Sequence, residues 1–188
     1  MFPPRPLRAA FPGMCPPRPI LFVVGDRAHS KFFSENAYTA AREAGNQVEK
    51  IELYDSFCKG CLACQKTLRC VIHDDADTIA QKMLTADVIV FATPVYYYEM
   101  FGQMKTMLDR ANPLYPADYA FRDIYLLAAA ADADKSAMDG AIKGLEGWIA
   151  CFEKARLAGT VFGGGADAIG TIQGNPALDE AYEMGKRV

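Results

Sequence analysis

Apolar and polar residues follow one another along this chain in blocks that predict buried strands separated by amphipathic helices. Two short apolar runs, residues 20–24 and 87–92, are rich in branched and aromatic side chains and show no alternation. Such runs are typical of strands covered on both faces. Thr93 and Pro94 are expected to stop the second run. The predicted strands are residues 20–24, 48–53, 87–92, 124–130 and 157–162.

Apolar residues at helical spacing predict a helix after each strand. The expected starting positions are Ser30 or Ser34, Asp74 or Asp75, a residue near Phe101, Ser136, and Asn175 followed by Pro176. The helix from residue 136 to residue 152 carries Gly140, Gly144 and Gly147 on one side. Glycine costs a helix about 1 kcal/mol relative to alanine. These three positions therefore predict the close approach of another backbone, at the sheet or at an oligomer interface.

This order of elements indicates the fold class. Strands and helices alternate five times, which implies right-handed crossovers and a parallel α/β sheet with helices on both faces. Ligands of such open sheets bind beyond the carboxyl ends of the strands, where the strand order reverses. The loops that begin at Gly25, Thr93 and Ala129 are therefore the candidate binding loops.

Composition narrows the class of protein. The chain has 188 residues, 51% of them apolar, and a net charge of -3. We expect one domain over residues 20–188, no nucleic-acid partner and no membrane partner. Seven of the eleven prolines lie in residues 1–19, which predicts a poorly ordered tail. Pro12 and Gly13 interrupt the only apolar stretch of this tail, so we expect no export and a cytoplasmic protein.

Three short motifs carry a family resemblance. The sequences PVY at 94–96, GQMK at 102–105 and LDR at 108–110 follow an ADVIVF strand. In this order they resemble the NADPH-dependent FMN reductase and iron-sulfur flavoprotein group. The resemblance implies a flavodoxin-like three-layer sandwich with strand order 2-1-3-4-5, and FMN at the switch point. It also implies NAD(P)H as substrate, a small-molecule acceptor or redox protein as partner, and a homodimer or tetramer.

The same resemblance implies a set of FMN contacts. In the family, the loop after the third strand lines the flavin ring and ribityl chain, which here points to Thr93, Pro94, Val95, Tyr96 and Tyr97. A flat aromatic wall suits a large π system. The alternative is that the three consecutive tyrosines from residue 96 cover the sheet edge or an interface. By analogy with the fold, the pyrimidine end would meet Ala130 and Asp132.

The loop after the first strand departs from the family pattern. Family members place hydroxyl residues and a helix N-terminus around the FMN phosphate. Here Asp26 stands where a neutral hydroxyl residue is expected, and a carboxylate repels phosphate. Arg27, Ser30 and Lys31 are the candidate phosphate contacts, by charge and hydrogen bonding. An ordinary solvated loop is the competing interpretation.

Four cysteines form a compact motif. Cys58, Cys61, Cys64 and Cys70 are similar to the cysteine motif of the iron-sulfur flavoproteins, which suggests a [4Fe-4S] site because such clusters need four thiolates. Zinc is a second interpretation, and free or redox-active thiols are a third. A fifth residue, Cys151, is interpreted as a small buried hydrophobe.

Three functions stay open. The first is an FMN-dependent NAD(P)H oxidoreductase that passes electrons to a quinone, flavin or protein acceptor, with the flavin carrying the chemistry. The second is an iron-sulfur flavoprotein that acts as an electron carrier. The third is a degenerate flavodoxin-fold module without flavin, which the altered loop at residues 25–32 permits. Asp109 and Arg110 are expected to pair with each other or with a neighbouring subunit.

Overall fold

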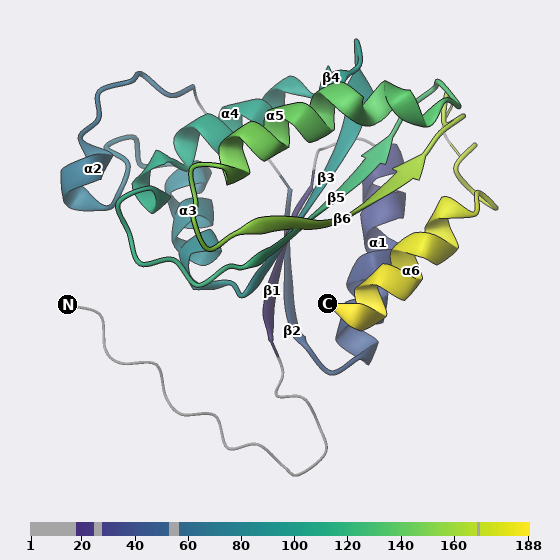
Figure 1. Ribbon diagram of the computed structural model, residues 1–188, viewed down its shortest axis with the longest axis horizontal. Coiled ribbons are helices and arrows are strands. Elements are labelled where there is room, and N and C mark those ends of the chain that lie inside the picture. The colour runs from purple at the N-terminus through teal and green to yellow at the C-terminus, as the bar shows by residue number, and fades with distance from the viewer. Residues whose placement is uncertain (1–17, 25–27, 53–56, 169) are drawn as a thin grey trace.

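The computed structural model describes residues 18–24, 28–52, 57–168 and 170–188 (Figure 1). Most of the predicted tail, residues 1–17, lies outside this range. Within the described ranges, every helix is too short or too polar to cross a membrane. The elements are β1 (Pro19–Val24), α1 (Ala28–Glu43), β2 (Gln47–Glu52), α2 (Cys64–Thr67), α3 (Asp75–Thr85), β3 (Val88–Tyr96), β4 (Glu99–Met100), α4 (Gly102–Arg110), η1 (Asn112–Leu114), β5 (Asp123–Ala129), η2 (Lys135–Met138), α5 (Asp139–Ile149), β6 (Arg156–Gly163) and α6 (Ala177–Arg187).

The sheet confirms the predicted strand order. Five parallel strands lie in the order β2-β1-β3-β5-β6, and β4 pairs antiparallel with the end of β3. In chain order, these five strands are the predicted 2-1-3-4-5 arrangement. The strand order reverses between β1 and β3, so these two strand tips border the expected ligand crevice.

Helices cover both faces of the sheet (Figure 1). On one face, α1 and α6 pack over alternate residues of β1 and β3, including Phe22 and Val90. On the other face, α3, α4 and α5 pack over the residues that point the opposite way, including Val23 and Phe91. Because both faces are buried, β1 and β3 consist of the continuous apolar runs from which they were predicted.

Pro94 does not end β3, which corrects one prediction. The strand continues to Tyr96, and Pro94 still lies opposite Ala129 of β5. Proline lacks a backbone donor but keeps its carbonyl, and its fixed φ is compatible with an extended chain. Beyond Pro94, Val95 pairs with Met100 and Tyr96 pairs with Glu99 in an antiparallel hairpin.

Several element boundaries also differ from prediction. Pro19 belongs to β1, where it pairs with Gln47, and α1 begins at Ala28 instead of Ser30 or Ser34. The last helix begins at Ala177, with Pro176 at its N-cap position. The Asn175 side chain still accepts a hydrogen bond from the Ala177 amide at 3.0 Å, so it caps the helix from one residue earlier.

Candidate functional site

A two-residue hairpin turn carries exposed tyrosines at the carboxyl edge of the sheet. Tyr97 and Tyr98 connect β3 to β4 with φ values of 51° and 63°. Two positive φ values in a two-residue loop are the pattern of a type I′ turn, which favours asparagine and glycine. Tyrosine at such positions carries backbone strain of order 1–3 kcal/mol. The Tyr97 side chain is 100% exposed, and those of Tyr96 and Tyr98 are also exposed.

The hairpin rests on α5. A Cβ atom at Gly140 would lie 2.1 Å from the Tyr98 carbonyl oxygen, and one at Gly144 would lie 3.1 Å from the Met100 methyl group. Gly147 has open space around it among the described residues. The expected close approach of a second backbone is therefore confirmed at Gly140, and the backbone belongs to the hairpin.

The loop after β5 reaches the same hairpin. The Tyr98 hydroxyl lies 3.4 Å from Asp132 Oδ2, and Asp132 Oδ1 accepts a hydrogen bond from the Asp134 amide at 2.9 Å. Ala130 is buried, and both its backbone amide and its carbonyl are bonded within the protein. The exposed Asp132 carboxylate is thus the accessible part of this loop. Tyr98 was not among the predicted cofactor contacts. The run of three consecutive tyrosines is the sequence feature that could have indicated it.

Thr93 and Pro94 shape the base of the hairpin. Thr93 is 1% exposed, and its hydroxyl donates to the Pro94 carbonyl at 2.8 Å and accepts from the Phe101 amide at 3.1 Å. Pro94 is also buried, whereas Val95 is partly exposed. The Thr93 hydroxyl is therefore engaged inside the protein, and it joins the two sides of the hairpin.

The predicted phosphate contacts lie at the start of α1. Arg27 is outside the described residues, as is Asp26. Ser30 and Lys31 lie in the first turn of α1, which begins at Ala28, and only their place in the helix is described. The backbone thus brings the start of a helix directly after the tip of β1, as a phosphate site requires.

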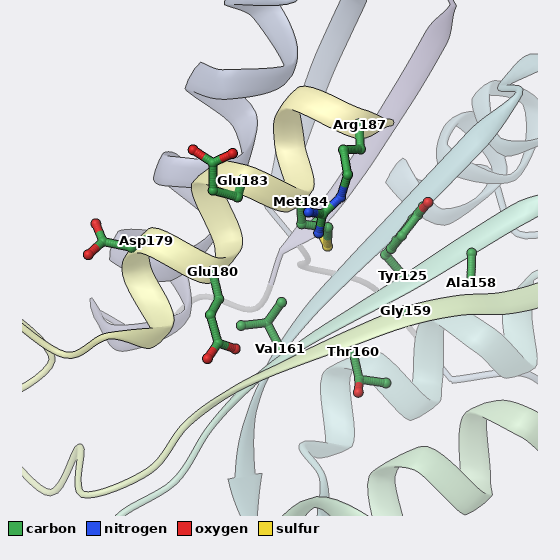
Figure 2. A pocket seen from close by; sticks show the side chains of 10 residues that line it. All are labelled: Tyr125, Ala158, Gly159, Thr160, Val161, Asp179, Glu180, Glu183, Met184 and Arg187. Carbon is green, nitrogen blue, oxygen red and sulfur yellow. The ribbon is translucent and has the colours of Figure 1, made fainter.

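A groove of about 460 Å³ lies elsewhere, between α6 and β6 (Figure 2). Tyr125 and Thr160 come from the sheet side of this groove, and Glu180 comes from α6. None of the predicted cofactor contacts is among its lining residues. The groove therefore does not mark the site that the tyrosines and Asp132 form at the strand tips.

The four clustered cysteines line one small pocket. Cys58 and Cys61 are exposed, Cys70 is intermediate and Cys64 is buried. The pocket holds about 30 Å³, which is space for about two water molecules. In the described part of the chain, no group of three or more His, Cys, Asp or Glu side chains is placed to hold a metal ion. The described thiols thus share a pocket but do not converge on one point.

Cys64 is the most enclosed of these thiols. Its burial raises the pKa of the Cys64 thiol, and the neighbouring Cys70 and Cys58 raise it further. The Asn112 side-chain amide lies 3.6 Å from Cys64 Sγ and acts in the opposite direction, because its hydrogen bond favours the thiolate. Sequence reasoning missed Asn112, which follows α4 and approaches the cysteines only in the folded chain.

The prediction that Cys151 is buried is wrong, because Cys151 is exposed. Asp109 and Arg110 do not pair with each other, because Asp109 bonds Lys105 one helical turn earlier and the Arg110 guanidinium bonds Asp74. Contact of these two residues with a neighbouring subunit stays a prediction. The two side chains point to different sides of α4, as neighbouring helical residues must.

Comparison with known proteins identifies the family. Residues 20–165 match the NADPH-dependent FMN reductase family, a range that includes the hairpin, the cysteine pocket and β6. The chain belongs to this family.

Two of the named relatives are iron-sulfur flavoproteins. An iron-sulfur flavoprotein of Methanocaldococcus jannaschii is 40% identical over 81 residues, which are 42% of this chain and 42% of that protein. An iron-sulfur flavoprotein of Methanosarcina thermophila is 28% identical over 152 residues, 79% of this chain and 76% of that protein. The chain thus matches less than half the length of the first relative and about three quarters of the second.

Solved structures support the fold. The Trp repressor binding protein from Bacillus subtilis superposes with a TM-score of 0.66 and 21% identity, over 89% of this chain and 99% of that chain. An azoreductase from Bacillus anthracis superposes with a TM-score of 0.68 and 19% identity, over 91% and 100%. At these identities the superpositions establish the flavodoxin-like fold alone.

The described residues supply chemical groups suited to FMN, which the family name suggests, and to an iron-sulfur cluster, which the names of the two relatives suggest. For FMN, the fit is an exposed aromatic surface held at the strand tips by a strained, buttressed turn. For an iron-sulfur cluster, the fit lies in the donor set, because four thiols line one pocket and a cluster of this type requires four thiolates.

Proposed function

We propose that this protein binds FMN at the tips of β1, β3 and β5 and acts as an NAD(P)H-dependent oxidoreductase. The observation that carries the proposal is the strained type I′ turn at Tyr97 and Tyr98, which packs closely against Gly140 of α5. Strained backbone tends to occur where a function requires it. Membership of the NADPH-dependent FMN reductase family supports the same reading.

The chain's own residues bind and orient the cofactor. Tyr96 and Tyr97 supply the aromatic wall, together with the backbone of Thr93, Pro94 and Val95. At the opposite end, Ser30 and Lys31 with Arg27 bind the phosphate at the start of α1. The loop from Ala130 to Asp132 forms the third side of the proposed FMN site, next to the hairpin. FMN supplies the hydride and single-electron chemistry when bound, and the protein determines its position and electrostatics.

Substrates alternate at this one site. NAD(P)H and an acceptor would both need access to the flavin ring where it is not covered by the hairpin residues. The acceptor would be a quinone, a free flavin or a protein. Shared access predicts ping-pong kinetics. We also propose that the protein works as a homodimer or tetramer.

Tyrosine substitution tests the site. Tyr96→Ala and Tyr97→Ala should each weaken FMN binding, measured by quenching of flavin fluorescence, because each removes part of the wall. Base-to-aromatic stacking is worth about 1–3 kcal/mol, which corresponds to a loss of affinity of about 5- to 150-fold. Tyr115→Ala is the matched control, since Tyr115 is also exposed but lies outside the hairpin. Unchanged affinity in both hairpin variants contradicts the proposed wall.

The cysteine pocket favours a second function, electron transfer through an iron-sulfur cluster. The four thiols share one pocket, and the named relatives include iron-sulfur flavoproteins. The cluster would be held by Cys58, Cys61, Cys64 and Cys70, and it would supply single-electron transfer to a redox protein.

One measurement separates the open functions. An absorbance spectrum of anaerobically purified protein, with its iron, sulfide and zinc content, distinguishes a flavoprotein, an iron-sulfur flavoprotein and a zinc protein. NAD(P)H oxidation with an artificial acceptor then separates a reductase from a carrier. A protein that purifies colourless and stays so after addition of FMN contradicts the flavin site and supports the flavin-free module.

A further inference from the structure

Arg110 is a buried cation at the inner wall of the cysteine pocket. Its side chain is 0% exposed, and its two terminal nitrogens donate to the Asp74 carboxylate at 2.6 and 2.9 Å. One of them also donates to the Ile72 carbonyl at 3.2 Å. Bidentate pairing of this kind fixes both the distance and the orientation of the two groups. Arg110 therefore ties α4 to the segment that follows Cys70.

The segment on the other side of Cys70 is tied down as well. Asp77 of α3 is buried, and its Oδ1 accepts a hydrogen bond from the Cys70 amide at 3.0 Å. Its Oδ2 accepts a hydrogen bond from the Arg69 guanidinium at 2.7 Å. Cys70 is thus held from two sides. Asp77 accepts a hydrogen bond from its backbone amide, and Arg110 donates to the carbonyl of Ile72, two residues later in the chain.

Arg110 and Cys70 line the same pocket. The Asp74 carboxylate raises the pKa of Arg110, and an interaction with Cys70 raises it further. Two other charged residues line the same pocket, Lys59 and Asp109. Lys59 is exposed, and Asp109 is half exposed and bonded to Lys105. Water screens exposed charges, so the buried Arg110 guanidinium is the least screened charge of this pocket, and the partly exposed Asp74 carboxylate opposes it.

We propose that Arg110 is a positioning residue that holds Cys70 in place, and that the charges of Arg110 and Asp74 act in opposite directions on the reduction potential of an iron-sulfur cluster in this pocket. The inference rests on the iron-sulfur part of the proposed function. A cluster with four thiolate ligands gains one negative charge on reduction. A buried guanidinium beside one ligand favours the reduced state, and the Asp74 carboxylate opposes that effect.

A set of four variants tests the electrostatic part. The measurement is an anaerobic redox titration of the cluster, followed by its electron paramagnetic resonance signal. Arg110→Met should lower the potential, because Asp74 loses its counterion, and Asp74→Asn should raise it. The double variant should return close to the wild-type value, since it removes a neutral pair. Arg110→Lys should stay near wild type because it keeps the charge.

The control is Lys59→Met, which removes an exposed positive charge from the same pocket. It should shift the potential less than Arg110→Met does. A purely structural role for Arg110 would not produce shifts of opposite sign that cancel in the double variant. Equal potentials in all variants, with the cluster fully retained, overturn the electrostatic inference.

The positioning part is tested without a cluster. In the iron-free protein, trypsin cleavage within residues 57–73 reports how often the loop opens. Arg110→Met removes three charge-assisted hydrogen bonds, so cleavage should become about tenfold faster or more, with Arg110→Lys between it and wild type. An unchanged rate overturns this part. If reconstituted wild-type protein holds no iron and sulfide, the cluster proposal and the electrostatic inference fail, while the cleavage result still decides the positioning role.

Discussion

Gly140 supports the tyrosine hairpin, and its substitution by alanine measures how strongly. The added Cβ would lie 2.1 Å from the Tyr98 carbonyl oxygen and 3.2 Å from its carbonyl carbon. A carbon and an oxygen in close contact are normally about 3.3 Å apart or more. The obstacle is backbone, which cannot rotate away as a side chain can. Either the hairpin or the start of α5 must therefore move by about 1 Å.

The stability change of Gly140→Ala combines an unfavourable packing contribution and a favourable helix-propensity contribution. Overpacking of this kind costs about 1–3 kcal/mol. Alanine has the higher helix propensity, which stabilises the helix by up to about 1 kcal/mol relative to glycine, and by less near a helix start. The net expectation for Gly140→Ala is a loss of about 1–2 kcal/mol. For a domain of this size, that loss lowers the melting temperature by about 2–8 °C.

The same substitution elsewhere on α5 is the control. Gly147 has open space around it, so Gly147→Ala should gain up to about 1 kcal/mol. At Gly144, the nearest atoms to an added Cβ are the Met100 methyl group and the carboxylate oxygens of Glu99, which belong to flexible side chains. The stability of Gly144→Ala should therefore lie between those of Gly140→Ala and Gly147→Ala. Thermal and urea unfolding measure all three. If Gly140→Ala is as stable as Gly147→Ala, α5 does not support the hairpin. Titration with FMN should show weaker binding for Gly140→Ala alone.

Three more predictions concern the turn, the helix pair and the cysteines. Replacing Tyr97 by Asn and Tyr98 by Gly gives the residues a type I′ turn prefers, and should stabilise the fold by about 1–2 kcal/mol while weakening FMN binding; unfolding and flavin titration must move in opposite directions. Gly185→Ala places a Cβ 2.3 Å from the Ala37 carbonyl and should destabilise the α1–α6 contact by about 1–3 kcal/mol; an unchanged urea midpoint contradicts that contact. Cys64→Ala should abolish iron retention after anaerobic reconstitution, whereas Cys151→Ser, at an exposed position, should keep it and leave stability within about 0.5 kcal/mol; equal iron contents contradict the assignment.

The parallel α/β class and the position of the candidate binding loops at the carboxyl edge were predictable because they depend on local patterns, whereas the strand order was implied by the family resemblance. Continuous apolar runs such as residues 20–24 occur where both sheet faces are covered, and alternation with helices then leaves few topologies. The hairpin was less predictable. Proline usually ends a strand, and tyrosine is unfavourable at positive φ, so local propensity favoured a loop after Thr93. The strand continues because β5 pairs with it up to Pro94 and β4 folds back on its last two residues.

By itself, the amino-acid sequence determined the class of fold, the family and the residue types available for chemistry, because periodicity and motif spacing are properties of neighbouring residues. Only the tertiary structure decided which distant residues meet. Arg110 and Asp74 are separated by 36 positions, and Asn112 and Cys64 by 48, yet each pair is in contact. Such contacts depend on how α4 packs against α3 and the cysteine loop, and no pattern within either segment specifies that packing.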